Sequence, residues 1–249
     1  MKTFTITFSI LTVLAAWVVQ AGAQVCTPPC ACVCPSTELN AYELKEPIKN
    51  SPTVTVCTNF ACGDMRVKRT IRLFTPSAEV PPPAVTPHYL GYELLSENYP
   101  ESSNPGVLTF STTHNNTTQN TRTQTVLLLV PAGKSIPSKG EPAPTLPATS
   151  DGFLCFKPSS RALGTGQITN TDQFGTQTFV IHRVAYTCIN ASIGTGLKPS
   201  TTTYLLGVAA KDSTSKFHPE AAIIDIFHPL ELIDLDPIDE LVSIATVTQ

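Results

Sequence analysis

The sequence lacks most of the features that usually mark a chemical activity. Charged residues make up only 14% of the 249 residues, and the formal net charge is −3. There is no basic excess of the kind that binds nucleic acid, and no polybasic stretch for an acidic membrane surface. The motifs HExxH, GxSxG and the Walker loop are also missing, so no common metal, nucleophile or phosphate site is marked. The acidic residues near the C-terminus could bind calcium but lack the spacing of an EF-hand loop, so we expect them to form a solvated acidic end: Asp225, Asp234, Asp236, Asp239 and Glu240. We expect no catalytic residues, no cofactor and no enzymatic activity.

Long apolar runs are missing except at the start of the chain. Lys2 is followed by an apolar stretch over residues 4–19 and by the small residues Ala21-Gly22-Ala23. A basic start, a short apolar core and small residues at the end are typical of a secretory signal peptide, here residues 1–23. The run is short for a membrane span, which needs roughly 20 residues, although an N-terminal anchor is the alternative. We expect a secreted protein, with the cell surface as a further location and no span after signal removal.

The chain contains eight cysteines, which secretion would place in an oxidising environment. Four of them crowd into a predicted Cys-rich segment, residues 24–36: Cys26, Cys30, Cys32 and Cys34. Their spacing lacks the paired CxxC of a zinc ribbon and no histidine lies nearby, so we expect disulfides and no metal site. Cys57 and Cys62 are also expected in disulfides, and the pairing of these six cysteines stays open.

Three asparagines stand in glycosylation sequons. Asn115 and Asn116 begin two overlapping sequons, and Asn190 begins a third. In a secreted eukaryotic protein, these sites would carry glycans on surface loops.

The rest of the chain has the pattern of β structure. Apolar runs are short, rich in Val, Ile, Thr, Phe and Tyr, and bounded by Gly, Pro, Asn and Ser. The segment Asp172-Gln173-Phe174-Gly175 is predicted to be a turn with an aromatic plug, because Gly accepts the positive φ of a tight corner. Helix signals are limited to residues 229–233, with Pro at a helix start position, and 238–242. The expected fold class is mainly β with little helix.

Four segments of this β pattern resemble one another: residues 37–78, 87–134, 151–192 and 202–249. They begin with ELNAYEL, HYLGYEL, GFLCFKP and TYLLGVA, and further strand-like runs follow each start. Pro-rich joints such as EVPPPAVTP separate them and should be extended. We interpret the segments as tandem small β modules with sandwich-like or barrel-like sheets. Modules of about 45 residues are too small to be stable alone, so they should pack together. The alternative is that similar strands arose by chance.

Cys155 and Cys188 belong to the third segment. Cys155 lies on its first predicted strand and Cys188 on its last, whereas the other segments have no cysteine at the corresponding places. A reactive thiol would need a nearby His, Arg or helix start, but Phe153, Leu154 and Phe156 surround Cys155. The simplest interpretation is a disulfide between these two strands.

The third segment is similar to a tandem β-rich domain of unknown function in secreted bacterial proteins. That domain combines an F-x-C-[YF]-K strand, a DQFG turn and a later cysteine. The match covers residues 151–192 only and implies a β-rich extracellular module without catalytic residues. The matching residues are Phe153, Cys155, Phe156, Lys157, Asp172, Gln173, Phe174, Gly175 and Cys188.

The expected function is that of a secreted, non-enzymatic structural or adhesive protein of the cell surface or extracellular matrix. Its partners would be other extracellular or surface proteins, including copies of itself. Such a protein should expose strand edges and lack a deep polar pocket. The alternative is a secreted binding protein or inhibitor that uses the Cys-rich N-terminus, with a rigid loop between Cys26 and Cys34. A secreted hydrolase comes third and would need His and carboxylate groups converging in a pocket.

Overall fold

The computed structural model describes residues 38–49, 52–77, 88–97, 99–100, 104–122, 124–212 and 219–248. All of them belong to one compact unit, residues 35–249. The predicted signal peptide and the Cys-rich segment with Cys26, Cys30, Cys32 and Cys34 lie outside the described residues. Within the described residues, no helix has the length and apolar character needed to cross a membrane.

The fold is mainly β, which confirms the expected class. The described residues form one 13-stranded sheet and a single turn of 3₁₀ helix, η2 (Pro137–Lys139). The strands are β1 (Glu38–Lys49), β2 (Thr53–Cys57), β3 (Cys62–Ser77), β4 (His88–Glu97), β5 (Val107–Ser111), β6 (Asn116–Asn120), β7 (Thr125–Ser135), β8 (Asp151–Phe156), β9 (Gly166–Asp172), β10 (Gly175–Ile193), β11 (Tyr204–Asp212), β12 (Glu220–Asp225) and β13 (Glu231–Thr248).

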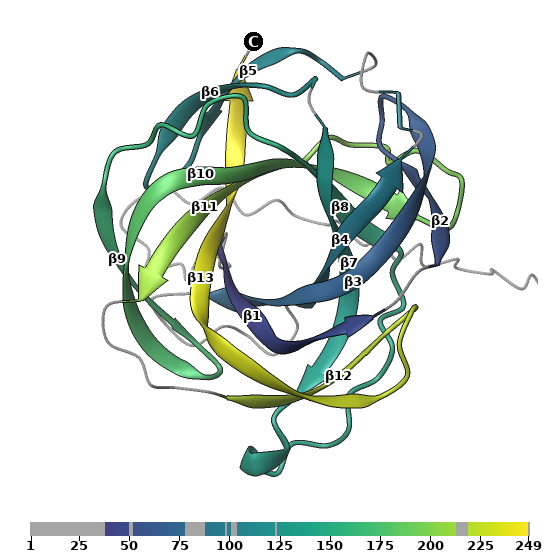
Figure 1. The fold of residues 1–249 in the computed structure, drawn as a ribbon, viewed down its shortest axis with the longest axis vertical. Coiled ribbons are helices and arrows are strands. Elements are labelled where there is room, and N and C mark those ends of the chain that lie inside the picture. Colours follow the sequence, from purple (N-terminus) through teal and green to yellow (C-terminus); the bar gives the residue numbers. More distant parts are fainter. Residues whose placement is uncertain are drawn as a thin grey trace, which may run out of the picture. The chain divides into compact units, whose positions relative to one another are not determined.

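Eight of these strands close on themselves as a ring. Each strand pairs antiparallel with the next in the order β1, β3, β4, β7, β8, β10, β11 and β13, and β13 pairs back with β1. The closing register runs from Glu38 opposite Ser243 to Leu44 opposite Leu235. Figure 1 looks down this ring. Each strand of the ring is therefore paired along both of its edges.

The other five strands lie on the outer face of the ring (Figure 1). Residues of β2, β5, β9 and β12 join the larger apolar cluster, which also contains Tyr42, Leu90 and Phe156 from ring strands. A smaller cluster contains residues of the eight ring strands alone. Side chains on a strand alternate between its two faces, so the smaller cluster fills the interior and the larger one lies outside, beneath the added strands.

The four similar segments each contain two ring strands. Residues 37–78 hold β1 and β3, 87–134 hold β4 and β7, 151–192 hold β8 and β10, and 202–249 hold β11 and β13. Between its two ring strands, each segment inserts one or two outer strands. All of them belong to a single sheet, so the segments do not form separate sheets, and four distinct modules remain a prediction.

The interior of the ring is narrow and needs small residues beside large ones. Ala41 pairs with Phe74, and Gly207 pairs with Tyr186. A Cβ atom on Gly207 would collide with the Tyr186 ring, and one on Gly91 would lie 2.6 Å from the Phe74 ring. An eight-stranded closed sheet has just enough room for its side chains. The small residues are thus required by the aromatic rings that fill the centre.

The helices expected at residues 229–233 and 238–242 are wrong. Both segments fall at or within β13, which begins at Glu231 and pairs with β1, β11, β12 and β5 along its length. A short amphipathic signal competes poorly with backbone hydrogen bonds to strands on both sides. By contrast, the predicted turn is confirmed, because Gln173 and Phe174 connect β9 to β10 and Gly175 has a φ of +136°.

A disulfide joins Cys155 of β8 to Cys188 of β10 across the shortest ladder of the ring. That ladder has three residue pairs, from Asn190 opposite Phe153 to Ser192 opposite Asp151. Continuing the same register by two residues places Cys155 opposite Cys188. The disulfide therefore holds the two strands together where their backbone pairing has ended. A second disulfide joins Cys57 to Cys62 across the β2–β3 hairpin.

Two similar Tyr–Asp contacts fasten outer turns to ring strands. In the first, Tyr42 of β1 donates to Asp172 at 2.7 Å, and the Tyr42 ring meets Phe174 edge-on at 5.0 Å. Asn40 and Thr75 also donate to the same Asp172 oxygen, at 2.9 and 3.0 Å. The second Tyr–Asp contact repeats this arrangement with Tyr92 of β4, Asp225 and Phe227, whose ring centroid is 5.2 Å from that of Tyr92.

In both Tyr–Asp contacts, the second carboxylate oxygen caps its own turn. Asp172 accepts the backbone N–H of Phe174 at 2.8 Å, and Asp225 accepts that of Phe227 at 2.8 Å. Each contact therefore needs the local sequence Asp-x-Phe and a tyrosine from a distant strand. When the four segments are compared by sequence, this turn is recognised only in the third segment, and Asp225-Ile226-Phe227 in the fourth is missed.

We predict that losing the Cys155–Cys188 disulfide costs more stability than losing Cys57–Cys62. The first closes 33 residues and the second only 5. Chain entropy alone then gives a cost of about 3–4 kcal/mol for Cys155→Ala/Cys188→Ala, about 2 kcal/mol more than for Cys57→Ala/Cys62→Ala. Urea unfolding of the two double variants measures this difference. Equal losses would contradict the prediction that the disulfide with the longer loop contributes more to stability.

We also predict that Tyr42→Phe destabilises the fold by about 1–3 kcal/mol, because it removes one donor from a buried carboxylate. The hydroxyl also accepts from Gln177 at 2.8 Å, which would lose that acceptor. Tyr204→Phe is the matched control, since the Tyr204 hydroxyl has no hydrogen-bond partner among the described residues. It should change the free energy of unfolding by less than about 0.5 kcal/mol. Similar values for both variants would rule out a stabilising role for the contact.

Candidate functional site

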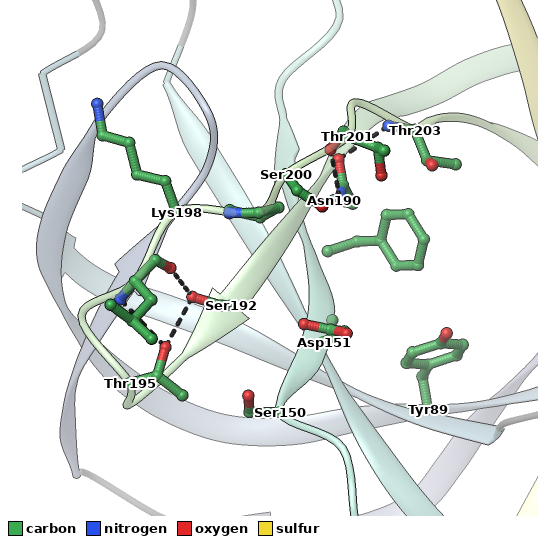
Figure 2. A pocket seen from close by; sticks show the side chains of 14 residues that line it. Tyr89, Ser150, Asp151, Asn190, Ser192, Thr195, Lys198, Ser200, Thr201 and Thr203 are labelled. Atoms are coloured by element: carbon green, nitrogen blue, oxygen red, sulfur yellow. Dashed lines mark hydrogen bonds between the residues drawn. The ribbon is translucent and has the colours of Figure 1, made fainter. Parts of the chain in front are cut away.

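A pocket opens where β4 and β8 begin and where β10 ends in the loop over residues 194–203. Its volume is about 490 Å³, and its lining includes Tyr89, Asp151, Phe153, Asn190 and residues 195–203 (Figure 2). The rings of Tyr89 and Phe153 lie 5.6 Å apart and meet edge-on, although β7 separates their two strands. Tyr89 belongs to the interior cluster, and Phe153 packs against it. The pocket is therefore the mouth of the ring, with the interior aromatic residues as part of its wall.

The loop over residues 194–203 is tied down by side chains of β10. Asn190 donates to the Thr201 carbonyl at 3.0 Å and accepts the Thr203 N–H at 2.8 Å. Ser192 forms hydrogen bonds with Thr195, at 2.9 Å, and with the Leu197 carbonyl. Figure 2 draws these bonds. Since both sides of the loop are bonded to the strand, the wall of the pocket is preformed.

Other polar groups of the pocket have no partner among the described residues. The Asp151 side chain is exposed and forms no hydrogen bond or ion pair there. Tyr89 is a buried residue, and its hydroxyl also has no hydrogen-bond partner there. Burial, together with the charge of Asp151, raises the pKa of Tyr89 to about 12. The phenol is therefore neutral at physiological pH, and the carboxylate is the free charge at the pocket wall.

Most residues singled out from the sequence lie away from this pocket. Cys155 and Cys188 are buried inside the ring, and Asp172 and Phe174 hold the first Tyr–Asp contact. Asn115 and Asn116 lie at the tip of the β5–β6 hairpin, where use of their sequons remains a prediction. Phe153, which the resemblance named, lines the pocket. Of the expected disulfide and glycosylation residues that the structure describes, Asn190 alone does so, and it lies within β10 with its amide already bonded, unlike the surface loop expected of a sequon.

The histidines with a described environment do not contribute to the pocket. His228 is buried, its ring stacks on Tyr92, and its Nδ1 lies 2.7 Å from the Tyr92 hydroxyl. His114 lies 2.7 Å from Glu38. Burial lowers the pKa of His88 to about 3, so its ring is neutral. His182 is exposed on β10, and the buried Nδ1 of His88 has no hydrogen-bond partner within the described residues.

A second polar cluster lies deeper in the ring, further along β10. On one face of this strand, Asn190 reaches the pocket, Cys188 forms the disulfide, and Tyr186 reaches the cluster. There Arg72 pairs with Asp239 at 2.6 Å and with Glu240 at 3.2 Å. The hydroxyl of Tyr186 is buried beside Glu240, and the Glu240 oxygen that pairs with Arg72 is buried as well.

Burial dominates the protonation of this cluster. It raises the pKa of Glu240 to about 7, with Arg72 opposing the shift and Asp239 reinforcing it. Burial alone would lower the pKa of Arg72, but the neighbouring Glu240 and Asp239 raise it above the usual value. Arg72 therefore remains charged, and it is held by Asp239 at 2.6 Å. Glu240 is the group that exchanges a proton near neutral pH.

The acidic C-terminal residues do not form the uniformly solvated end that the sequence predicted. Asp225 and Glu240 are buried, at 4% and 8% exposure, and each has a specific neighbour: Tyr92 for Asp225 and Arg72 for Glu240. Asp234 is exposed, as expected. Glu240 is buried because β13 lies between β1 and β11 and turns alternate side chains into the ring. Asp225 ends the outer strand β12 and is buried in its contact with Tyr92.

Sequence reasoning missed Asp151 and Tyr89 as site residues. Asp151 directly precedes the GFLCF strand, and Tyr89 begins the HYLGYEL segment. Their only signal was a polar group at the start of an apolar ring strand. Tyr89 and Asp151 can be recognised as neighbours only once the closed ring is known, because closure brings the starts of β4 and β8 to the same mouth.

We predict that Glu240 makes stability depend on pH between about 4.5 and 7. Its ordinary pKa is 4.5 and its folded pKa is about 7, so in this window the folded state alone holds the proton. Stability relative to Glu240→Gln should be largest below pH 4.5 and should fall as the pH rises to 7, by at most about 1.4 kcal/mol per pH unit. Urea unfolding of both proteins across this range gives the difference.

Glu220→Gln serves as the control for this measurement, because Glu220 is an exposed carboxylate on β12. Its difference from the unmodified protein should stay constant over the same pH range. A constant difference for Glu240→Gln as well would contradict the raised pKa.

Comparison with known proteins identified no relative. No protein-family model matches the chain, and no curated protein and no solved structure matches it. The site must therefore be interpreted from its own chemistry.

Proposed function

We propose that the protein is a secreted, non-enzymatic adhesive protein that binds its partner through the pocket at the mouth of the ring. The observation that carries the proposal is the pocket itself: a preformed cavity with a free carboxylate, several hydroxyls and two aromatic rings. Apolar walls with a few fixed polar groups are typical of ligand sites. The two disulfides suit an extracellular location.

The closed ring favours recognition over strand addition. A structural protein that assembles by adding strands needs free edges. Each ring strand is paired on both sides, and within the described residues only two short outer strands, β6 with five residues and β9 with seven, have a single partner. We had also expected such a protein to lack a deep polar pocket. Adhesion through side chains at the mouth fits both observations better than edge-to-edge assembly does.

The remaining alternatives find less support in the described residues. A hydrolase needs a base next to a nucleophile, and the hydroxyl of Ser192 is bonded to Thr195 and Leu197 with no histidine lining the pocket. Binding through the Cys-rich N-terminus concerns residues outside the described part of the chain. Binding through that segment would leave the pocket without a role.

The proposal is tested by filling the pocket. Ser200 lies on the exposed loop that lines it, so Ser200→Trp should block the cavity without disturbing the ring. Purified, fluorescently labelled protein is titrated onto intact cells and extracellular matrix of the organism that produces it. We expect saturable binding by the unmodified protein and at least about 10-fold weaker binding by Ser200→Trp, equivalent to about 1.4 kcal/mol.

The control variant is Thr113→Trp, which adds the same bulk at an exposed position in the β5–β6 turn. It should bind as the unmodified protein does. Equal binding by Ser200→Trp, or no saturable binding at all, would overturn the proposal. Mass spectrometry of the bound material should show it chemically unchanged, whereas cleavage would instead support the hydrolase.

A further inference from the structure

The pocket holds a hydrogen-bond acceptor that no group of the described chain uses. The Asp151 carboxylate, when ionised, can only accept, and it has no partner there. The nitrogen donors of the lining are turned to the backbone: Asn190 donates to the Thr201 carbonyl and Lys198 to the Phe60 carbonyl, each at 3.0 Å. A ligand must therefore donate a hydrogen bond if it is to satisfy Asp151.

The charge of the pocket points the same way. Lys198 is the one basic residue on the lining, and Figure 2 shows its side chain extending away from Asp151 and Tyr89. Within the described residues, no basic group forms an ion pair with Asp151. The carboxylate thus remains an uncompensated negative charge at a preformed cavity.

Aromatic rings complete the arrangement. Phe153 is two residues beyond Asp151 on β8, so both side chains are on the same face of the strand. Tyr89 lies against Phe153 from β4. Aromatic faces attract cations through their quadrupole, and a neighbouring carboxylate adds a charge-assisted hydrogen bond. Carboxylate, phenol and phenyl ring together form a site for an organic cation.

We propose, on the basis of the function proposed above, that the group recognised in the pocket is an alkylammonium or guanidinium cation. The Asp151 carboxylate accepts its N–H groups, the Tyr89 hydroxyl accepts a further hydrogen bond, and the Phe153 ring contacts its alkyl or cationic face. A lysine or arginine side chain of a partner protein and a free amine both carry this chemistry. A neutral ligand of the same size can offer Asp151 at most an uncharged hydrogen bond, and an anionic ligand leaves it unpaired.

The test titrates defined probes into the full mature chain by calorimetry and NMR. The cations are n-butylammonium and methylguanidinium, and their neutral and anionic counterparts are n-butanol and butanoate. We expect binding of the cations alone, with shifts at Asp151 and along residues 199–203. Asp151→Asn should weaken cation binding about 10-fold or more, and Phe153→Leu about 3-fold. Glu220→Gln, which removes an exposed carboxylate elsewhere, should leave binding unchanged.

A capped Gly-Lys-Gly peptide distinguishes the two sources of the cation. Tighter binding than n-butylammonium indicates a side chain of a partner protein, and weaker binding indicates a free amine; both agree with a cation site. Equal binding of n-butanol, or unchanged cation binding by Asp151→Asn, would overturn the inference.

The same variant separates this inference from the proposed function. If Ser200→Trp abolishes adhesion but Asp151→Asn does not, the pocket binds a partner through another chemistry, and the cation inference fails alone. If the cations bind but the protein does not adhere to cells or matrix, the adhesive function fails and the cation site stands.

Discussion

Closure of the ring by β1 and β13 is the constraint on which the rest of the structure depends. The pairing of Glu38–Lys49 with Glu231–Thr248 joins strands almost 200 residues apart, and it leaves no ring strand with an unpaired edge. It also fixes the interior volume, so that Phe74 and Tyr186 can be accommodated only beside Gly91 and Gly207. The pocket exists because a closed ring must have a mouth, where interior side chains meet solvent.

Three contacts reinforce this closure at different places. The disulfide holds β8 to β10 where their ladder is shortest, and the two Tyr–Asp contacts hold outer turns against ring strands. Each Tyr–Asp contact joins the first half of the chain to the second, Tyr42 with Asp172 and Tyr92 with Asp225. Because they link distant segments, these contacts add stability only once the ring has formed. They favour the closed arrangement over open sheets with the same strands.

The local features of the fold could be predicted from the sequence, and the long-range ones could not. The strand pattern, the turn at Asp172–Gly175 and the facing positions of Cys155 and Cys188 depend on short stretches whose periodicity and turn residues are visible. The pairing of β1 with β13 depends on strands that only folding brings together. For the same reason, the local pattern predicts solvated side chains for Asp225 and Glu240, and it predicts helices at residues 229–233 and 238–242. The site residues Asp151 and Tyr89 belong to this second group.

The position of the pocket explains how a few groups could give useful affinity. Binding usually loses free energy when loops and side chains become ordered, but Asn190 and Ser192 already hold the loop over residues 194–203 to β10. The aromatic wall is equally fixed, because Tyr89 packs within the interior and its strand is paired on both sides. A ligand therefore meets a rigid surface whose free carboxylate is set at the edge of a low-dielectric interior, where charge–charge attraction is stronger than in bulk water. In the proposed function, the closed ring that stabilises the fold would therefore also hold the groups at its mouth in place for the ligand.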